Sequence, residues 1–368
     1  MCKARRVSLG LPQGRARLKV AVDATPLLGR RTGIGLFCLE SLGALSRRDE
    51  LDLSAFAVTW RRRHLLETMV PPPVRVVRRA MPARPLHRLW ARTSVPPIEW
   101  FVGSTDVVHG MNYVVPPTRA AARVVSVIDL TAVHYPQVAD PATLVYPALI
   151  RRAVAEGAWV HTASHFVAGE IVAEFGVDTN RVRVVPLGIP SHDEPGHDEP
   201  GQHETGPDTP PPSAIALPDG VERYVLAVGT LEPRKDLAGL VRAFEAMAGD
   251  RPDVALVLAG SAGWGTDALS EAVAASKWRR RIVATGYLDD AVLRTVLAGA
   301  AVLAYPSVYE GFGFPPLEAM RAGVPVVCST AGSIPEVVGD GALLAPVGDT
   351  EALAGALASV LDDGDVRR

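Results

Sequence analysis

Residues 309–320 read YEGFGFPPLEAM, two glutamates separated by glycine, phenylalanine and proline. The stretch follows the apolar run VLAYPS, which is typical of a buried strand. Its two prolines fit the first turn of a helix that Gly323 would close. The sequence therefore predicts strand, loop and helix here, with Glu310 in the loop and Glu318 in the first turn of the helix.

The same alternation of strand and helix runs through both halves of the chain. In the first half, KVAVD (19–23) leads through a loop into the amphipathic stretch LFCLESLGAL, and Ser164 is expected to cap a later helix. In the second half, YVLAVGT, VALVLAGS and RIVATGYL alternate with helical stretches. This alternation favours parallel sheets covered on both faces. The predicted fold class is α/β, with two doubly wound Rossmann-like domains that face each other across a cleft.

Residues 189–220 interrupt this alternation. Residues 189–213 of this stretch contain the tandem HDEPG and almost nothing apolar, so we expect a flexible linker over residues 189–220, rich in Pro, His, Asp and Glu. The predicted domains are residues 1–188 and residues 221–368. Ligands of open α/β folds bind at the carboxyl ends of the strands, so the site is expected in the cleft between the two domains.

Composition and cysteine usage bear on localisation. The chain has 368 residues, of which 48% are hydrophobic and 21% charged, as in soluble globular proteins. It has no uninterrupted apolar run of about 18 residues, and its first 20 residues lack the apolar core of a signal peptide. Cys2, Cys38 and Cys328 have no pairing or metal-ligand spacing, and we expect the last two to be buried. A cytoplasmic protein is therefore expected.

The charges are unevenly distributed. Residues 60–92 hold nine arginines and one glutamate, interleaved with Trp, Leu and Val. One interpretation is a surface that meets an anionic membrane, which would make the protein peripheral at the inner face, or an anionic acceptor. The other is a solvated face in a chain with 34 arginines and only four lysines. Both interpretations stay open, and no nucleic acid partner is expected.

Two kinds of loop in the second half carry candidate chemistry. Arg234 and Lys235 precede a predicted helix start near Asp236 or Leu237, and two cations beside a helix N-terminus form an anion site. Gly260, Ser261 and Gly286 end strands with little side-chain bulk, which would let a planar base lie against the backbone. Ordinary tight turns remain the alternative for these strand ends.

The two glutamates of the opening stretch need not act on one bond. Each carboxylate can accept hydrogen bonds from adjacent hydroxyl groups, Glu318 from a ribose and Glu310 from a hexose. Gly311 and Gly313 would let a diphosphate approach the backbone between them. The sequence thus indicates a nucleotide sugar as ligand.

Residues 224–356 resemble the nucleotide-binding domain of retaining glycosyltransferases of the GT-B fold, family 4 (glycosyl transferases group 1). The motifs GTLEPRKDL, LAGSAGW, TGYL, PSVYEGFGFPPLEAMRAGVPVVCS and SIPEVVGDGALL follow the pattern of that family in order and spacing. The first half matches more weakly, through RTGIG, HGMNYVVPP, VIDLTAVHYP, TASHF and VVPLGI. The EPRK form is most similar to the mannosyltransferase-like subset.

The resemblance implies a hexosyltransferase that moves a hexose, mannose from GDP-mannose in that subset, to a polysaccharide, lipid-linked or small-molecule acceptor with retention. It implies no cofactor and no metal. The first domain would be the acceptor side. The expected catalytic residues are Glu310, Lys235, Arg234 and Asp129. The expected donor-binding residues are Gly33, Gly35, Thr230, Gly260, Gly286, Tyr287, Leu288, Gly311, Phe312, Gly313 and Glu318, and His109 and Asn112 are expected on the acceptor side.

Two departures from the family pattern support an alternative. Ile128 stands where the family usually has His, and the chain stops where relatives continue into a helix that crosses back onto the first domain. A non-catalytic or truncated nucleotide-binding member of the same fold therefore remains open. A glycosidase would need both carboxylates at one bond, and a nicotinamide enzyme would need GxGxxG directly after a strand. The run at residues 33–38, GIGLFC, lacks the third glycine.

Overall fold

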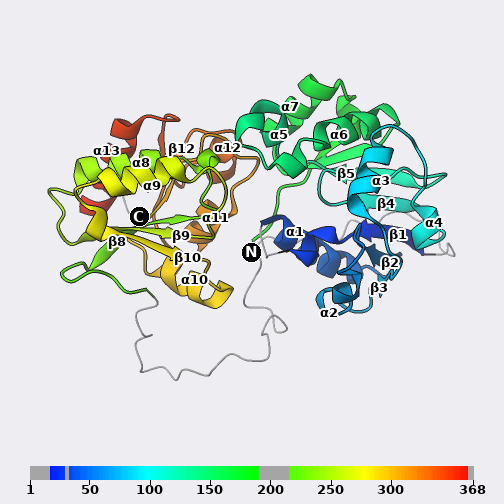
Figure 1. Cartoon of the computed structure of the whole chain (residues 1–368), viewed down its shortest axis with the longest axis horizontal. Coiled ribbons are helices and arrows are strands. Elements are labelled where there is room, and N and C mark those ends of the chain that lie inside the picture. The colour runs from blue at the N-terminus through cyan, green and yellow to red at the C-terminus, as the bar shows by residue number, and fades with distance from the viewer. Residues whose placement is uncertain (1–16, 30–32, 190–214, 364–368) are drawn as a thin grey trace. The chain divides into compact units, whose positions relative to one another are not determined.

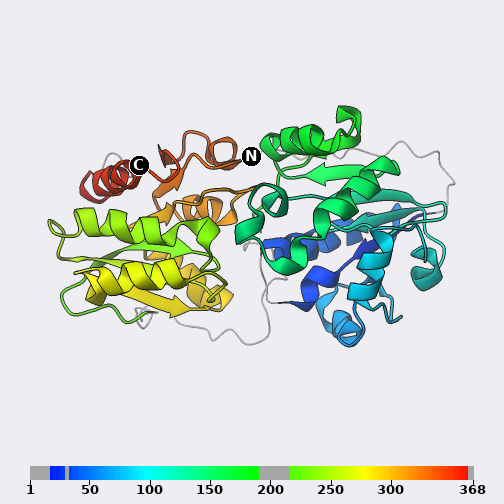
Figure 2. The ribbon, with the colours of Figure 1, turned by 45° about the horizontal axis from the view of Figure 1, so that its top comes forward.

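The computed structural model describes residues 17–29, 33–189 and 215–363. It contains a seven-stranded sheet, in the order β3-β2-β1-β4-β5-β6-β7, and a six-stranded sheet, in the order β10-β9-β8-β11-β12-β13 (Figures 1 and 2). Both sheets are parallel, and in both the strand order reverses beside the first strand, between β1 and β4 and between β8 and β11. Such a reversal is the ligand-binding point of doubly wound sheets. The predicted α/β class with two Rossmann-like sheets is confirmed.

In the described residues, seven α-helices connect the strands of the first sheet. Its strands are β1 (Leu18–Asp23), β2 (Leu51–Phe56), β3 (Arg75–Val76), β4 (Val107–Gly110), β5 (Ala122–Ser126), β6 (Trp159–Thr162) and β7 (Val182–Val184). The helices are α1 (Gly33–Ser46), α2 (Leu66–Met69), α3 (Ala83–Trp90), α4 (Glu99–Val102), α5 (Thr131–His134), α6 (Tyr146–Ala155) and α7 (His165–Phe175).

The second sheet alternates with six helices. Its strands are β8 (Arg223–Val228), β9 (Val254–Ala259), β10 (Ile282–Gly286), β11 (Val302–Tyr305), β12 (Val326–Ser329) and β13 (Leu343–Ala345). The helices are α8 (Leu237–Met247), α9 (Asp267–Ala275), α10 (Asp290–Ala298), α11 (Phe314–Arg321), α12 (Ile334–Val338) and α13 (Thr350–Asp362). Within the described ranges, no helix combines the length and the apolar character needed to cross a membrane.

The second sheet has a core on each face. Successive strand residues point to opposite faces, so Val225 and Ala227 pack into one core while Leu226 packs into the other. The first core is completed by α8, α9 and α13, and the second by α10, α11 and α12. Figure 1 shows α8 and α9 above the strands of this sheet and α10 below them. Burial on both faces explains why β9, VALVLA, is apolar and buried throughout.

Several local predictions are confirmed. Ser164 caps α7, since its side chain accepts a hydrogen bond from the Val167 N–H at 3.2 Å. Asp236 caps α8 in the same way, and that helix begins at Leu237. Cys38 and Cys328 are both buried, as expected, whereas Cys2 lies outside the described residues.

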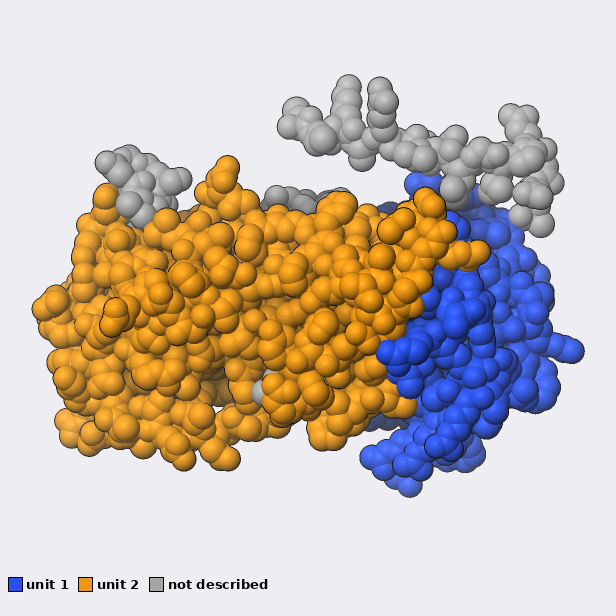
Figure 3. All heavy atoms as spheres, turned by 90° about the horizontal axis from the view of Figure 1, so that it is seen from above, with its two compact units in different colours: residues 1–126, 148–160 blue, residues 127–147, 161–368 orange. Residues whose placement is uncertain are grey.

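The chain divides into two compact units (Figure 3). Unit 1 comprises residues 1–126 and 148–160, and unit 2 comprises residues 127–147 and 161–368. Unit 2 therefore holds the second sheet together with α5, α7 and β7. The domain bounds 1–188 and 221–368 stay predictions. Most of the predicted linker 189–220, namely residues 190–214, lies outside the described residues.

Candidate functional site

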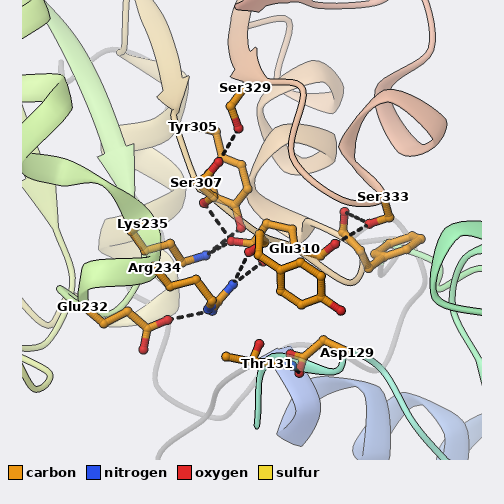
Figure 4. Close-up of polar contacts among 12 residues, drawn as sticks. Asp129, Thr131, Glu232, Arg234, Lys235, Tyr305, Ser307, Glu310, Ser329 and Ser333 are labelled. Atoms are coloured by element: carbon orange, nitrogen blue, oxygen red, sulfur yellow. Dashed lines mark hydrogen bonds and ion pairs between the residues drawn. The ribbon is translucent and has the colours of Figure 1, made fainter. Parts of the chain in front are cut away.

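The predicted cations and the first glutamate meet at the carboxyl ends of two neighbouring strands of unit 2. The loop after β8 carries Arg234 and Lys235 in a 3-10 turn immediately before α8. The loop after β11 carries Glu310, 75 positions from Lys235 in the sequence (Figure 4). β8 and β11 are parallel neighbours, so their carboxyl ends share one edge of the sheet. The topology therefore brings the three side chains together at the strand-order reversal.

The Glu310 carboxylate is 7% exposed and is held by three donors. Its Oε1 accepts from Lys235 Nζ at 2.5 Å and from Ser307 Oγ at 2.8 Å, and its Oε2 lies 2.8 Å from Arg234 Nη1. Burial alone would raise the pKa of Glu310, but the charges of Arg234 and Lys235 outweigh it and lower the pKa from 4.5 to about 2. Glu310 is therefore a carboxylate at ordinary pH.

Both cations have further partners. Lys235 Nζ donates to the Tyr305 hydroxyl at 2.7 Å and lies 4.5 Å from the centre of that ring. Burial lowers the pKa of Lys235, and the negative charge of Glu310 opposes that shift. Arg234 donates to Glu232 at 2.6 Å and to the carbonyl of the residue before Glu310 at 2.8 Å. Two cations thus face two carboxylates, Glu232 and Glu310, in one buried network.

The loop after Glu310 adds backbone donors to this network. In the part of the chain that the structure describes, the N–H groups of Gly311, Phe312 and Gly313 make no hydrogen bond to protein. Gly313 has φ +111, a region that side chains rarely adopt, and it precedes the first residue of α11. Free N–H groups beside buried cations are suited to an anionic ligand with several oxygens.

Gly311 also has a packing role that the sequence did not reveal. A Cβ at Gly311 would lie 1.9 Å from the Ile128 carbonyl oxygen, so the loop packs directly on the segment 128–131. The Ser164 hydroxyl donates to the Gly311 carbonyl at 3.0 Å. Asp129 lies on that segment, where it accepts from the Thr131 N–H at 3.0 Å. The predicted catalytic Asp129 is thereby held close to the Glu310 loop (Figure 4).

Tyr309 also connects the Glu310 loop with the segment 128–131. Its hydroxyl accepts from the Leu130 N–H at 2.8 Å and donates to Glu170 on α7 at 2.7 Å. The other oxygen of Glu170 lies 3.2 Å from His134 Nε2. The Tyr309 ring also lies 5.3 Å from the ring of Tyr135, between centroids. Tyr309 is therefore fixed at its hydroxyl, at its ring and, through Arg234, at its carbonyl.

Glu318 lies farther along the helix than predicted. α11 begins at Phe314, so Glu318 is in the second turn, and the expectation of a first-turn position is wrong. The helix starts earlier because Gly313 makes the left-handed turn and Phe314 can already be helical, with the prolines following in the first turn. Burial, and then the charge of Asp290, raise the pKa of Glu318. Among the described residues its carboxylate accepts no hydrogen bond, which leaves it available to a ligand.

The two glycines at the strand ends have different structural reasons: close backbone packing at Gly260 and a positive φ at Gly286. A Cβ at Gly260 would lie 1.9 Å from the Gly229 carbonyl oxygen, and the Gly260 N–H donates to the Gly286 carbonyl at 2.9 Å. Gly286 itself is exposed, with φ +72. The tight-turn interpretation therefore accounts for Gly260, and an approaching base is not needed to explain it. Of the other predicted donor residues, Tyr287 is 49% exposed, Leu288 packs on the second core, and Thr230 follows β8.

Four predicted residues belong to unit 1. Gly33 and Gly35 lie in the first turn of α1, and a Cβ at Gly35 would be 3.3 Å from a carbonyl oxygen. His109 lies in β4, and its Nε2 is 2.8 Å from the Ser126 hydroxyl. Asn112 follows β4. Their roles stay predictions.

Sequence reasoning missed several side chains around the Glu310 loop. They are Glu170, Glu232, Tyr305, Ser307, Tyr309 and Ser333, whose hydroxyl lies 3.1 Å from the Glu310 carbonyl and 3.2 Å from the Phe312 carbonyl. Ser307 and Tyr309 lie within the motif PSVYEGFG, close to Glu310 in the sequence, so they could have been identified from it. Glu170 was not, because it is on α7, 139 positions from Tyr309. In the part of the chain described, no group of three His, Cys, Asp or Glu is placed to hold a metal ion.

Comparisons with known proteins show which families and folds the chain is similar to. Residues 213–368 match the family model described as glycosyl transferases group 1. The O-antigen chain mannosyltransferase B of Escherichia coli is 42% identical over 145 residues, 39% of this chain and 38% of that protein. The MMP α-(1→4)-mannosyltransferase of Mycolicibacterium hassiacum is 32% identical over 207 residues, 55% of this chain and 44% of that protein. The matches thus span less than half of each relative.

A solved structure extends the likeness over nearly the whole chain. HepE of Anabaena, in complex with UDP, superposes with a TM-score of 0.64 and 18% identity. The superposition covers 95% of this chain and 91% of that chain. At this identity the likeness concerns the fold.

Proposed function

We propose, from the match of residues 213–368 to the model of glycosyl transferases group 1 and from the GT-B fold, that the chain transfers a hexose from a nucleotide-diphosphate sugar to an acceptor with retention. The observation that carries the proposal is the buried network of Arg234, Lys235 and Glu310 beside the free N–H groups of residues 311–313. This network places fixed positive charge next to N–H groups that can donate hydrogen bonds to sugar or phosphate oxygens. Binding of a nucleotide-diphosphate sugar requires both.

Each side chain of the network has a role in this proposal. Arg234 and Lys235 bind the diphosphate and stabilise the charge that develops on it as it leaves, and preorganised charge is often the largest contribution to such a rate. Glu310 and the backbone of residues 311–313 hold the hexose. Glu318, whose carboxylate has no protein partner among the described residues, accepts from the two ribose hydroxyls.

The proposed reaction is metal-independent. The acceptor oxygen attacks C1 of the hexose on the face from which the diphosphate leaves. As the bond from C1 to the phosphate oxygen breaks and the bond from C1 to the acceptor oxygen forms, the acceptor proton passes to an oxygen of the departing diphosphate. Activity that is lost in EDTA and restored by a divalent ion would refute the metal-free part.

The donor and acceptor are proposed from relatives. The two relatives named above are mannosyltransferases by name, which supports mannose from GDP-mannose. The Anabaena structure contains UDP, so uridine donors belong in the same test. For the acceptor we propose a polysaccharide, a lipid-linked glycan or a small molecule. For the location we propose the cytoplasm, because the cysteines have no pairing pattern.

One observation favours a second candidate, a nucleotide-binding protein without transfer activity. Ile128 packs through its carbonyl against Gly311, and its hydrocarbon side chain can give a donor sugar no hydrogen bond. If transfer depends on such a bond from this position, the chain binds nucleotides only. Turnover separates the two candidates.

The experiment begins with a thermal-shift titration of the purified chain with GDP, UDP, ADP and NAD. The proposal predicts stabilisation by one nucleoside diphosphate, weakened in Lys235→Ala. The corresponding sugar donor is then incubated with acceptors, and the product anomer is determined by NMR. Stabilisation without turnover supports the second candidate, and no stabilisation by any diphosphate contradicts both.

A further inference from the structure

A surface of unit 1 combines exposed apolar side chains with arginine. Between residues 60 and 100, around the edge strand β3 and helices α2, α3 and α4, five large apolar side chains are exposed. They are Trp60 (61% exposed), Met69 (37%), Leu89 (42%), Val95 (52%) and Trp100 (55%). The nine arginines of residues 60–92 lie in these elements or in the loops and the short 3-10 turn beside them. We call residues 60–100 the basic-aromatic surface.

Hydrogen bonds join the separate segments of this surface. Arg63 donates through Nε to the Arg78 carbonyl at 2.8 Å and through Nη1 to the Trp60 carbonyl. Arg79, the next residue, donates to the Trp100 carbonyl. Trp60 and Trp100 are therefore connected through three arginines, although they are far apart in the sequence. These bonds bring the segments that carry Trp60, Arg63, Arg78, Arg79 and Trp100 next to one another in the folded unit.

The charge of this surface is left uncompensated. Among the described residues only Arg78 of the nine arginines pairs with a carboxylate, that of Glu67 at 2.6 Å. Arg62, Arg63 and Arg79 donate to neutral carbonyl oxygens, which orient a guanidinium without cancelling its charge. Elsewhere several arginines do pair with acids, as Arg123 does with Glu156, Arg223 with Asp253 and Arg251 with Asp362.

We propose that the basic-aromatic surface binds the protein to an anionic lipid bilayer. Arginines attract the negative headgroups, and tryptophan favours the interface between headgroups and acyl chains. The exposed aliphatic side chains of Leu89, Val95 and Met69 favour a bilayer over a soluble polyanion as the partner. Their burial at the acyl boundary contributes binding free energy, whereas contact with a hydrated polymer contributes little. The proposal does not depend on sugar transfer.

The test is co-sedimentation of the full chain with vesicles. Vesicles of phosphatidylcholine alone are compared with vesicles containing about 30% phosphatidylserine, at low salt and at about 0.3 M salt, where screening shortens the reach of surface charge. We expect binding to the anionic vesicles, weakened by salt. The charge variant Arg75→Ser/Arg84→Ser/Arg88→Ser, at three exposed arginines, is expected to bind about tenfold or more weakly. At about 0.3 M salt the parent is expected to keep part of its binding to anionic vesicles. The aromatic variant Trp60→Ser/Trp100→Ser is expected to lose this salt-resistant part.

Arg279→Ser/Arg280→Ser is the matched control, because these two arginines are also exposed and basic but lie in unit 2. It should bind as the parent does. Circular dichroism confirms that each variant is folded. Equal binding to neutral and anionic vesicles, or an equal loss in the control, overturns the proposal. Binding to a soluble sulfated polysaccharide without binding to vesicles also overturns it, and assigns the surface to an anionic polymer.

Discussion

The Lys235 ammonium lies 2.5 Å from the Glu310 carboxylate, and the two residues are 9% and 7% exposed. A buried charge is costly unless it is paired, so each residue requires the other in the ligand-free protein. A diphosphate that reaches Lys235 and Arg234 therefore meets cations that already have a negative partner. Glu310 would set how much positive charge the ligand encounters, in addition to its proposed contact with the hexose.

The first prediction concerns Glu310→Gln. The change removes the negative charge that pairs with the buried cations Arg234 and Lys235. We therefore expect the free energy of unfolding to fall by about 3–5 kcal/mol. In the folded fraction, nucleoside diphosphate should bind more tightly while transfer becomes slower, because positive charge rises and a hexose contact is lost. Urea denaturation, calorimetric binding and initial rates measure the three effects. Glu271→Gln, at an exposed position of α9, is the control. Unchanged stability would show that the buried network is not formed in solution.

The second prediction concerns pH. The pKa of Glu310 is lowered from 4.5 to about 2, so its contribution to stability is present above pH 4.5 and is lost as the pH falls toward about 2. The difference in stability between the parent and Glu310→Gln should therefore be constant near neutrality and shrink across that window. Urea midpoints measured at intervals between neutral and acidic pH follow the difference. A difference that grew on acidification would have the wrong sign for a carboxylate paired in the folded state.

The third prediction concerns Tyr309→Phe. Loss of the hydroxyl leaves the Leu130 N–H and the Glu170 carboxylate without this partner, and we expect a cost of about 1–3 kcal/mol. The Tyr309 carbonyl accepts a hydrogen bond from Arg234. A Tyr309 that is no longer held at its hydroxyl would shift this carbonyl and with it the guanidinium, so transfer should slow as well. Tyr224→Phe is the matched control, since that hydroxyl is also buried and donates to the Val296 carbonyl at 2.6 Å. A purely structural role for Tyr309 would make the two variants equal in stability loss and in rate.

How far the sequence predicts this site depends on whether partners lie in the same motif. The alternation of strand and helix predicts both sheets, and the position of Arg234 and Lys235 before α8 follows from local patterns. The pairing of Glu310 with both cations does not, because it depends on β8 and β11 being neighbours. Glu170 lies on a helix of the first sheet, and no local pattern connects it with Tyr309.

The fourth prediction separates the two explanations of Gly311. If the glycine only admits a ligand, Gly311→Ala would alter binding and leave the unfolding free energy nearly unchanged. The structure instead places the added Cβ 1.9 Å from the Ile128 carbonyl, so we expect destabilisation of about 4 kcal/mol or more. Gly43→Ala is the control, since it lies within α1 with no atom within 4 Å of the added Cβ, and it should stabilise by about 0.5–1 kcal/mol. Urea denaturation compares the two variants.

The last prediction tests Glu318 as the ribose contact. Its carboxylate has no protein partner among the described residues, so Glu318→Gln should change stability little. It should weaken binding of the preferred nucleoside diphosphate by about 1.5–3 kcal/mol, the value of a hydrogen bond to a charged group.

The decisive comparison uses the 2′-deoxy and 3′-deoxy forms of the same diphosphate. If Glu318 accepts from the ribose hydroxyls, the parent binds the deoxy forms more weakly and Glu318→Gln adds little further loss. Because burial and Asp290 raise the pKa of Glu318, the parent's preference for ribose should also decrease on acidification, as the carboxylate becomes protonated. Equal losses for the ribose and deoxy forms in the variant would place Glu318 outside the ribose contact.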